Sequence, residues 1–201
     1  MAAIVVSAFP CCGKTYTYQN YQDKYKIADS DSSNFSWINR KRTPDELEEL
    51  KKYWESTDHL LSGDGFINQI KDKLVKVRNP EFPNNYIKHI KENLDNYDFI
   101  FVSSHLAVRQ ALTDNNIPFI TVYPDISCKT SWIGRMYLRG NDKKFIDFQV
   151  QNWAKFVNGI NDEPHGMGII RLEHNEYINL DKITNVYNMI KLRDKLIEIS
   201  Q

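Results

Sequence analysis

The chain has 201 residues, a length that fits one domain built around a single hydrophobic core. Its 26 basic and 26 acidic residues give a formal net charge of zero, which argues against a general electrostatic attraction to nucleic acid or to an anionic membrane. No apolar stretch approaches the ~18 residues needed to cross a bilayer, and the N-terminus lacks the pattern of a signal peptide. We therefore expect a soluble, cytoplasmic protein without a membrane partner.

The cysteines indicate a reducing compartment. Cys11 and Cys12 are adjacent and Cys128 is distant, a spacing that fits neither a disulfide framework nor a zinc site. The five histidines are equally scattered. We expect no zinc site.

Short apolar runs alternate with segments of helical pattern, which is typical of a parallel sheet covered by helices on both faces. The runs at 99–102 and 119–122 are apolar almost throughout, as expected for central strands that are buried on both faces. We predict an α/β fold of the P-loop NTPase type, with three layers and a five-stranded parallel sheet. The predicted strands are residues 3–7, 26–29, 99–103, 119–123 and 168–172.

Helices are predicted between these strands. Thr43 has the character of an N-cap, Pro44 suits the first helical position, and Asp45 and Glu46 form an acidic first turn. The predicted helices are residues 16–25, 43–57, 84–94, 105–113, 128–158 and 180–199.

A long segment separates the second predicted strand from the third. It has roughly 70 residues, far more than a simple crossover between parallel strands requires. Within a single domain spanning 1–201, we expect residues 39–96 to form a mostly helical insertion that binds the substrate.

The most specific motif is the run from Ala8 to Thr15, AFPCCGKT, which fits the Walker A pattern with alanine in place of the first glycine. A predicted strand precedes it and a predicted helix follows it, so backbone N–H groups and the positive helix end would converge on a phosphate. Lys14 would reach the β- and γ-phosphates of ATP, and the Thr15 hydroxyl would bind Mg²⁺. The expected ATP-binding residues are Ala8, Pro10, Cys11, Cys12, Gly13, Lys14, Thr15 and Tyr16.

Cys11 departs from the usual motif, because many such loops have glycine at this position. If the backbone there has a positive φ, a cysteine costs about 1–2 kcal/mol. Phosphate binding remains the prediction.

Two carboxylates, Asp29 and Asp31, follow the second predicted strand, which we expect to neighbour the strand before the Walker A loop. They could hold Mg²⁺ or accept the proton of an attacking hydroxyl, with Asp31 and Thr15 as the expected metal ligands. The alternative is a turn or helix cap built from Asp and Ser side chains.

Ser103, Ser104 and His105 follow the third predicted strand, where a motor-type ATPase would have an aspartate. Arg109 could reach a substrate anion from the next helix, although it could also be a solvated helix arginine. His105 could be a base, a helix cap or a neutral core residue.

Arg135 and Arg139 are four residues apart and share one face of a predicted helix. Residues 127–146 could form a lid that brings both cations over the transferred phosphoryl group. Alternatively, the two arginines pair with Asp142 or Asp147 on the surface.

Together these residues resemble the P-loop nucleoside monophosphate kinases and their relatives, the shikimate and gluconate kinases. The resemblance implies that Asp29 and Asp31 are the acidic acceptor motif, that Arg109 is the arginine after the third strand, and that Arg135 and Arg139 are lid arginines. In general style the chain is also similar to small nucleotide kinases encoded by phages. The implied catalytic residues are Lys14, Asp29, Asp31, Arg109, Arg135 and Arg139.

We therefore expect a kinase that uses ATP and Mg²⁺ to phosphorylate a small-molecule acceptor, a (deoxy)nucleoside monophosphate. One alternative is a kinase for a hydroxyl of a polynucleotide or modified base, with the basic run 39–42 at its substrate site and Trp37 or Tyr86 as stacking groups. Another is a regulatory nucleotide-binding module without an acceptor. A homodimer is compatible with all three.

Overall fold

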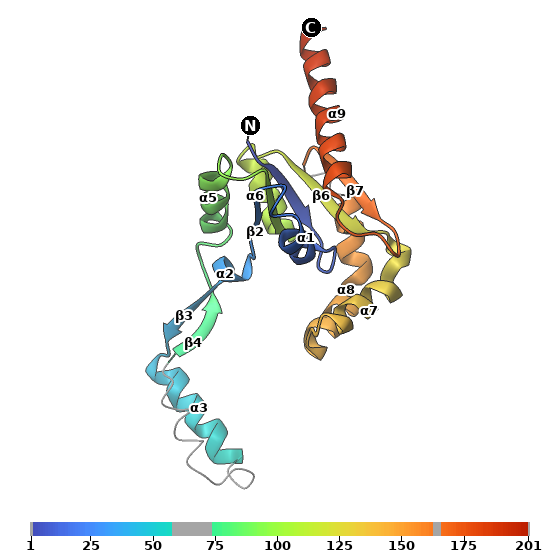
Figure 1. Cartoon of the computed structure of the whole chain (residues 1–201). Helices are drawn as coiled ribbons and strands as arrows, with labels where there is room; N and C mark the ends of the chain where they lie inside the picture. The colour runs from blue at the N-terminus through green and yellow to red at the C-terminus, as the bar shows by residue number, and fades with distance from the viewer. Residues whose placement is uncertain (1, 58–73, 163–165, 201) are drawn as a thin grey trace. The chain divides into compact units, whose positions relative to one another are not determined.

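The computed structural model describes residues 2–57, 74–162 and 166–200 of the chain. The chain divides into two compact units, which are described separately: Met1–Ser32 with Pro83–Gln201, and Ser33–Phe82. Figure 1 shows the course of the chain.

The first unit is built on a five-stranded parallel sheet in the order β2-β5-β1-β6-β7. The strand before the Walker A loop is central, and each predicted strand is confirmed to within one residue at either end. One expectation was wrong: the strand that carries Asp29 does not neighbour the Walker A strand, because β5 lies between them. The strands are β1 (Ile4–Ala8), β2 (Ile27–Asp29), β5 (Phe99–Ser103), β6 (Phe119–Pro124) and β7 (Gly168–Leu172).

Helices flank this sheet, which confirms the α/β class (Figure 1). The helical elements of this unit are α1 (Lys14–Asn20), α5 (Asn84–Asn93), α6 (Leu106–Asp114), the 3₁₀ turn η1 (Ile126–Cys128), α7 (Lys129–Leu138), α8 (Lys143–Asp162) and α9 (Leu180–Ile199). Within the described residues, no helix is long and apolar enough to cross a membrane.

The single helix expected at 128–158 was wrong, because the chain turns between α7 and α8. Gly140 has a φ of 79°, a left-handed conformation that a glycine adopts without a steric penalty. A new helix then begins, since the Asp142 carboxylate accepts a 2.8 Å hydrogen bond from the backbone N–H of Phe145.

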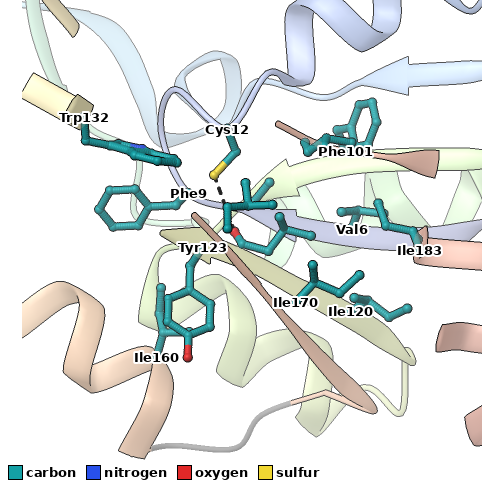
Figure 2. Close-up of a cluster of buried hydrophobic side chains, with 14 of the residues drawn as sticks. Val6, Phe9, Cys12, Phe101, Ile120, Tyr123, Trp132, Ile160, Ile170 and Ile183 are labelled. Atoms are coloured by element: carbon teal, nitrogen blue, oxygen red, sulfur yellow. Dashed lines mark hydrogen bonds between the residues drawn. The ribbon is translucent and has the colours of Figure 1, made fainter. Parts of the chain in front are cut away.

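The core lies on both faces of β1 and its neighbours. Val6, Phe101 and Ile120 have no exposed surface, and Figure 2 shows them with side chains that reach the sheet from the helices and the Walker A loop. Phe9 packs edge-to-face on Trp153 of α8, with their ring centroids 5.8 Å apart. The first residues of the loop are therefore part of the core.

The second unit covers part of the insertion expected at 39–96, of which residues 58–73 lie outside the described residues. It contains α2 (Ser33–Ser36), α3 (Pro44–Thr57) and an antiparallel pair of strands, β3 (Trp37–Lys41) and β4 (Leu74–Arg78). The sequence LVKVR of β4 alternates apolar and basic residues and contains two valines, which favours a strand. The unit ends at Phe82, so α5 belongs to the sheet unit although it was predicted within the insertion 39–96.

The predicted start of α3 is confirmed. Thr43 and Glu46 form a reciprocal capping box, in which the Thr43 hydroxyl accepts from the Glu46 N–H and the Glu46 carboxylate accepts from the Thr43 N–H. Arg40 of β3 donates two further hydrogen bonds to the same carboxylate, at 2.7 and 2.6 Å. The Arg40 hydrogen bonds, together with the capping bond, lower the pKa of Glu46 from 4.5 to about 2.

We predict that the junction of β3 and α3 weakens in acid. Because the folded-state pKa of Glu46 lies below its ordinary value, its contribution is complete above about pH 4.5 and declines as the pH falls towards 2. An NMR titration of the Glu46 carboxyl carbon should give a midpoint near 2, and Arg40→Gln should raise that midpoint towards 4.5. A midpoint near 4.5 in the unaltered protein would contradict the bidentate pair.

Candidate functional site

The candidate residues gather at one edge of the parallel sheet. The Walker A loop follows β1, Ser104 follows β5, and Asp31 follows β2. Because parallel strands end at the same edge, this edge is where an open α/β sheet binds its ligands.

The backbone carbonyl groups of the loop all point into the protein. Six consecutive carbonyls, from Ala8 to Gly13, accept hydrogen bonds from protein donors. In order along the chain, these donors are Lys14 Nζ, Cys12 N–H, Trp132 Nε1, Arg135 Nη1, Ile178 N–H and Thr17 N–H. The loop is thus held from α7 and from the segment before α9.

The backbone N–H groups at the end of the loop and the start of α1 are not bonded in this way. Those of Gly13, Lys14, Thr15 and Tyr16 have no acceptor among the described residues, and no side chain caps α1. Unpaired N–H groups at a loop-to-helix junction suit a bound anion.

Two residues of the loop have a left-handed backbone. Cys11 has a φ of 63°, so the steric cost expected for a cysteine at this position applies. Gly13 has a φ of 100°, and a Cβ there would lie 3.2 Å from Cδ1 of Tyr177. The glycine is required both by its φ and by the close approach of that ring.

Lys14 lies inside the loop. Its ammonium group donates a 3.0 Å hydrogen bond to the Ala8 carbonyl and is half-buried. Burial lowers the pKa of Lys14, while the negative charge of Asp29 opposes this effect and the positive charge of Arg139 adds to it. A partly desolvated cation in this position favours an anionic ligand.

Thr15 and Asp29 meet beside Lys14. The Thr15 hydroxyl donates a 3.1 Å hydrogen bond to Asp29 Oδ2. Both groups are hard oxygen donors, so the pair fits Mg²⁺, and Asp29 rather than the exposed Asp31 stands next to Thr15. Among the described residues no group of three or more His, Cys, Asp or Glu side chains could hold a metal, so the remaining ligands would be phosphate oxygens and water.

Tyr86 holds the end of β2 in place. Its hydroxyl donates a 2.7 Å hydrogen bond to the Ser30 carbonyl, and the Ser30 N–H donates to the Phe101 carbonyl of β5. Burial raises the pKa of Tyr86 well above its ordinary value. The suggestion that Tyr86 stacks on a substrate base was wrong, because its ring is fully buried.

Arg135 connects the loop to the segment before α9. Its guanidinium lies 3.8 Å from the ring centroid of Trp132 and 4.0 Å from that of Tyr177, and it donates to the carbonyls of His174 and Glu176. Two aromatic rings and two backbone carbonyls thus hold the guanidinium. They assign Arg135 a structural role at the loop.

Arg139 has a different environment. Its side chain is exposed, and its charge acts on both Lys14 and the Cys11 thiol. Burial raises the pKa of Cys11, against the opposing effects of Arg139, Lys14 and Arg135. The alternative pairing of the two arginines with Asp147 is not seen, since Asp147 binds Lys143.

Arg109 is buried, so the alternative of a solvated helix arginine was wrong. It is only 3% exposed, and its Nε donates a 3.2 Å hydrogen bond to the Ser104 carbonyl. His105 is the N-cap residue of α6, although its side chain makes no cap hydrogen bond. The expected contact of Arg109 with a substrate anion has no support from this geometry.

A cavity of about 400 Å³ opens beside Thr15 and Asp29. Most of the residues that line this cavity were not identified from the sequence. They come from α1, from the end of β2, and from α5 and the segment that follows it. The lining residues are Thr15, Tyr18, Gln19, Ile27, Ala28, Asp29, Ser30, His89 and Tyr97. The Ser30 hydroxyl is buried and has no hydrogen-bond partner among the described residues.

No protein-family model matches the chain, and no curated protein shows significant sequence similarity to it.

We predict that the two arginines of α7 differ in their effect on stability. Arg135→Lys keeps the charge but loses the planar group, so it should lower the free energy of unfolding by about 1–3 kcal/mol. Arg139→Lys, at an exposed position, should change it by less than ~0.5 kcal/mol. Urea denaturation measures both, and equal effects would argue against the structural role of Arg135.

Proposed function

We propose that the protein is a phosphotransferase of the P-loop NTPase type, which uses ATP and Mg²⁺. The observation that carries this proposal is the loop in which the carbonyls of residues 8–13 are bound by the protein while the N–H groups of residues 13–16 are left for a ligand. Anion binding by such a loop requires this polarity.

The chain's own residues would divide the work of phosphoryl transfer. The four N–H groups and Lys14 would bind the β- and γ-phosphates and stabilise the charge of the transition state. Thr15 and Asp29 would hold Mg²⁺, which supplies electrostatic stabilisation of the phosphate oxygens when it is bound. Arg139 is the exposed cation that could contact the transferred group.

For the acceptor, we propose a (deoxy)nucleoside monophosphate. The cavity beside Asp29 supports a nucleobase, because it offers the phenol rings of Tyr18 and Tyr97 for stacking and the polar groups of Gln19 and His89 for hydrogen bonds. No lysine or arginine lines it, so the acceptor phosphate would have to lie outside the cavity, towards Lys14 and Arg139.

A polynucleotide hydroxyl is the second candidate acceptor, and one observation favours it. Trp37 is 41% exposed on β3 and has cationic side chains over its ring. Of the basic run 39–42, however, Arg40 is held by Glu46.

We predict that Lys14→Ala lowers phosphoryl transfer at least ~100-fold, because it removes a positioned charge from the transition state. ADP formation from ATP and a panel of nucleoside monophosphates, with oligonucleotides as the comparison, measures this and identifies the acceptor. Lys155→Ala, at an exposed position on α8, is the control and should be fully active. Unchanged turnover in a folded Lys14→Ala protein would refute the proposal, and ATP binding with no acceptor would instead favour a regulatory module.

We predict a different outcome for each carboxylate after β2. Asp29→Asn should lower kcat more than ~10-fold and raise the Mg²⁺ concentration needed for half-maximal rate, because Asp29 is the carboxylate beside Thr15. Asp31→Asn should have the smaller effect. If only Asp31→Asn alters the Mg²⁺ dependence, the metal is held by Asp31 instead.

A further inference from the structure

The two-stranded sheet of the second unit has one face made entirely of exposed residues. In an antiparallel pair, directly opposite residues lie on the same face, and alternate residues of each strand share that face. The register therefore gathers six side chains, all exposed: Trp37, Asn39, Lys41, Leu74, Lys76 and Arg78. We call this set the hairpin face.

The hairpin face is positively charged. Lys41, Lys76 and Arg78 are its three cations, and it contains no acidic residue. In the described part of the chain, none of the three forms an ion pair with a carboxylate, whereas Arg40 on the opposite face is bound by Glu46. This local charge exists although the net charge of the whole chain is zero.

An exposed aromatic ring lies among these cations. Lys76 Nζ is 5.7 Å and Arg78 Cζ is 5.4 Å from the ring centroid of Trp37. Arg78 also lies 4.9 Å from the ring centroid of Phe82, so contacts with two aromatic rings hold its guanidinium. Trp37 is exposed, so its indole can contact an unpaired base, while the cations over its ring bind the adjoining phosphates.

We propose that the hairpin face binds single-stranded nucleic acid. Five residues per strand span about 14 Å, a length that accommodates a few adjoining nucleotides of a single strand. Stacking on Trp37 requires an unpaired base, which distinguishes a single strand from a duplex. This binding is independent of phosphoryl transfer, and so it can be measured in the Lys14→Ala protein as well.

The experiment measures fluorescence anisotropy of labelled 12-nucleotide DNA and RNA strands with the full chain. Neutralisation of three phosphates predicts a slope of log K against log salt of about −2, so binding should weaken about 20-fold between 50 and 200 mM salt. A duplex of the same sequence should bind more weakly than either single strand. Comparison of DNA with RNA shows which of the two is preferred.

Matched variants assign the binding to this face. Lys41→Gln, Lys76→Gln and Arg78→Gln together should abolish the salt-dependent binding, whereas Lys144→Gln, Lys155→Gln and Lys195→Gln remove the same charge elsewhere and should change Kd less than about twofold. Trp37→Ala should weaken binding at least ~5-fold, and Trp37→Phe should retain most of it. Should the triple variant fail to fold, Lys41→Gln and Lys76→Gln alone should each reduce the salt slope by about 0.7.

Four results would overturn the proposal. The first is no binding of either strand at 50 mM salt. The second is equal weakening by the hairpin and control triple variants. The third is equal affinity for duplex and single strands with no effect of Trp37→Ala. The fourth is stronger binding to phosphatidylserine vesicles than to the oligonucleotides.

Discussion

The candidate site depends on how the loop after β1 is held. A loop of this kind can present N–H groups to a ligand only if its carbonyl groups are bonded elsewhere, because buried carbonyls without partners are costly. Three of the six donors come from distant parts of the chain: Trp132 and Arg135 on α7, and the N–H of Ile178 before α9. The conformation of the loop is therefore a property of the folded sheet unit and not of the eight-residue motif alone.

The polar and aromatic side chains of α7 that bind the loop, Trp132 and Arg135, therefore have a structural explanation. Trp132 is fully buried, donates to the Pro10 carbonyl and supports the guanidinium of Arg135. Arg135 in turn stacks on Tyr177, the residue whose ring requires a glycine at position 13. The loop, α7 and the segment before α9 thus form one packed structure, and Arg139 is the arginine left exposed beside it.

The sequence predicted the local features well. The central strands β1, β5 and β6 could be found because each is a short apolar run, and the capping box at Thr43 is a local pattern. The strands β3 and β4 were missed although LVKVR has strand character, because they pair across more than thirty residues and no local pattern encodes that pairing.

Side-chain environments were harder to predict than the elements that carry them. Asp29 and Asp31 are only two positions apart in the sequence. Asp29, the last residue of β2, accepts a hydrogen bond from Thr15, whereas Asp31 is exposed. Tyr86 is buried against the end of β2 through a hydrogen bond to Ser30, 56 residues earlier, and no local spacing encodes such a contact. Arg109 is buried as well, although its hydrogen bond to Ser104 spans only five residues.

We propose above all that the loop between β1 and α1 binds the phosphates of ATP. The most direct test is hydrogen exchange of the full chain with and without a non-hydrolysable ATP analogue and Mg²⁺. We expect protection of the amides of residues 13–16, the groups that lack an acceptor in the described structure, and less protection without Mg²⁺. Binding of the analogue with unchanged exchange at these amides, or no binding at millimolar concentration, would contradict the account.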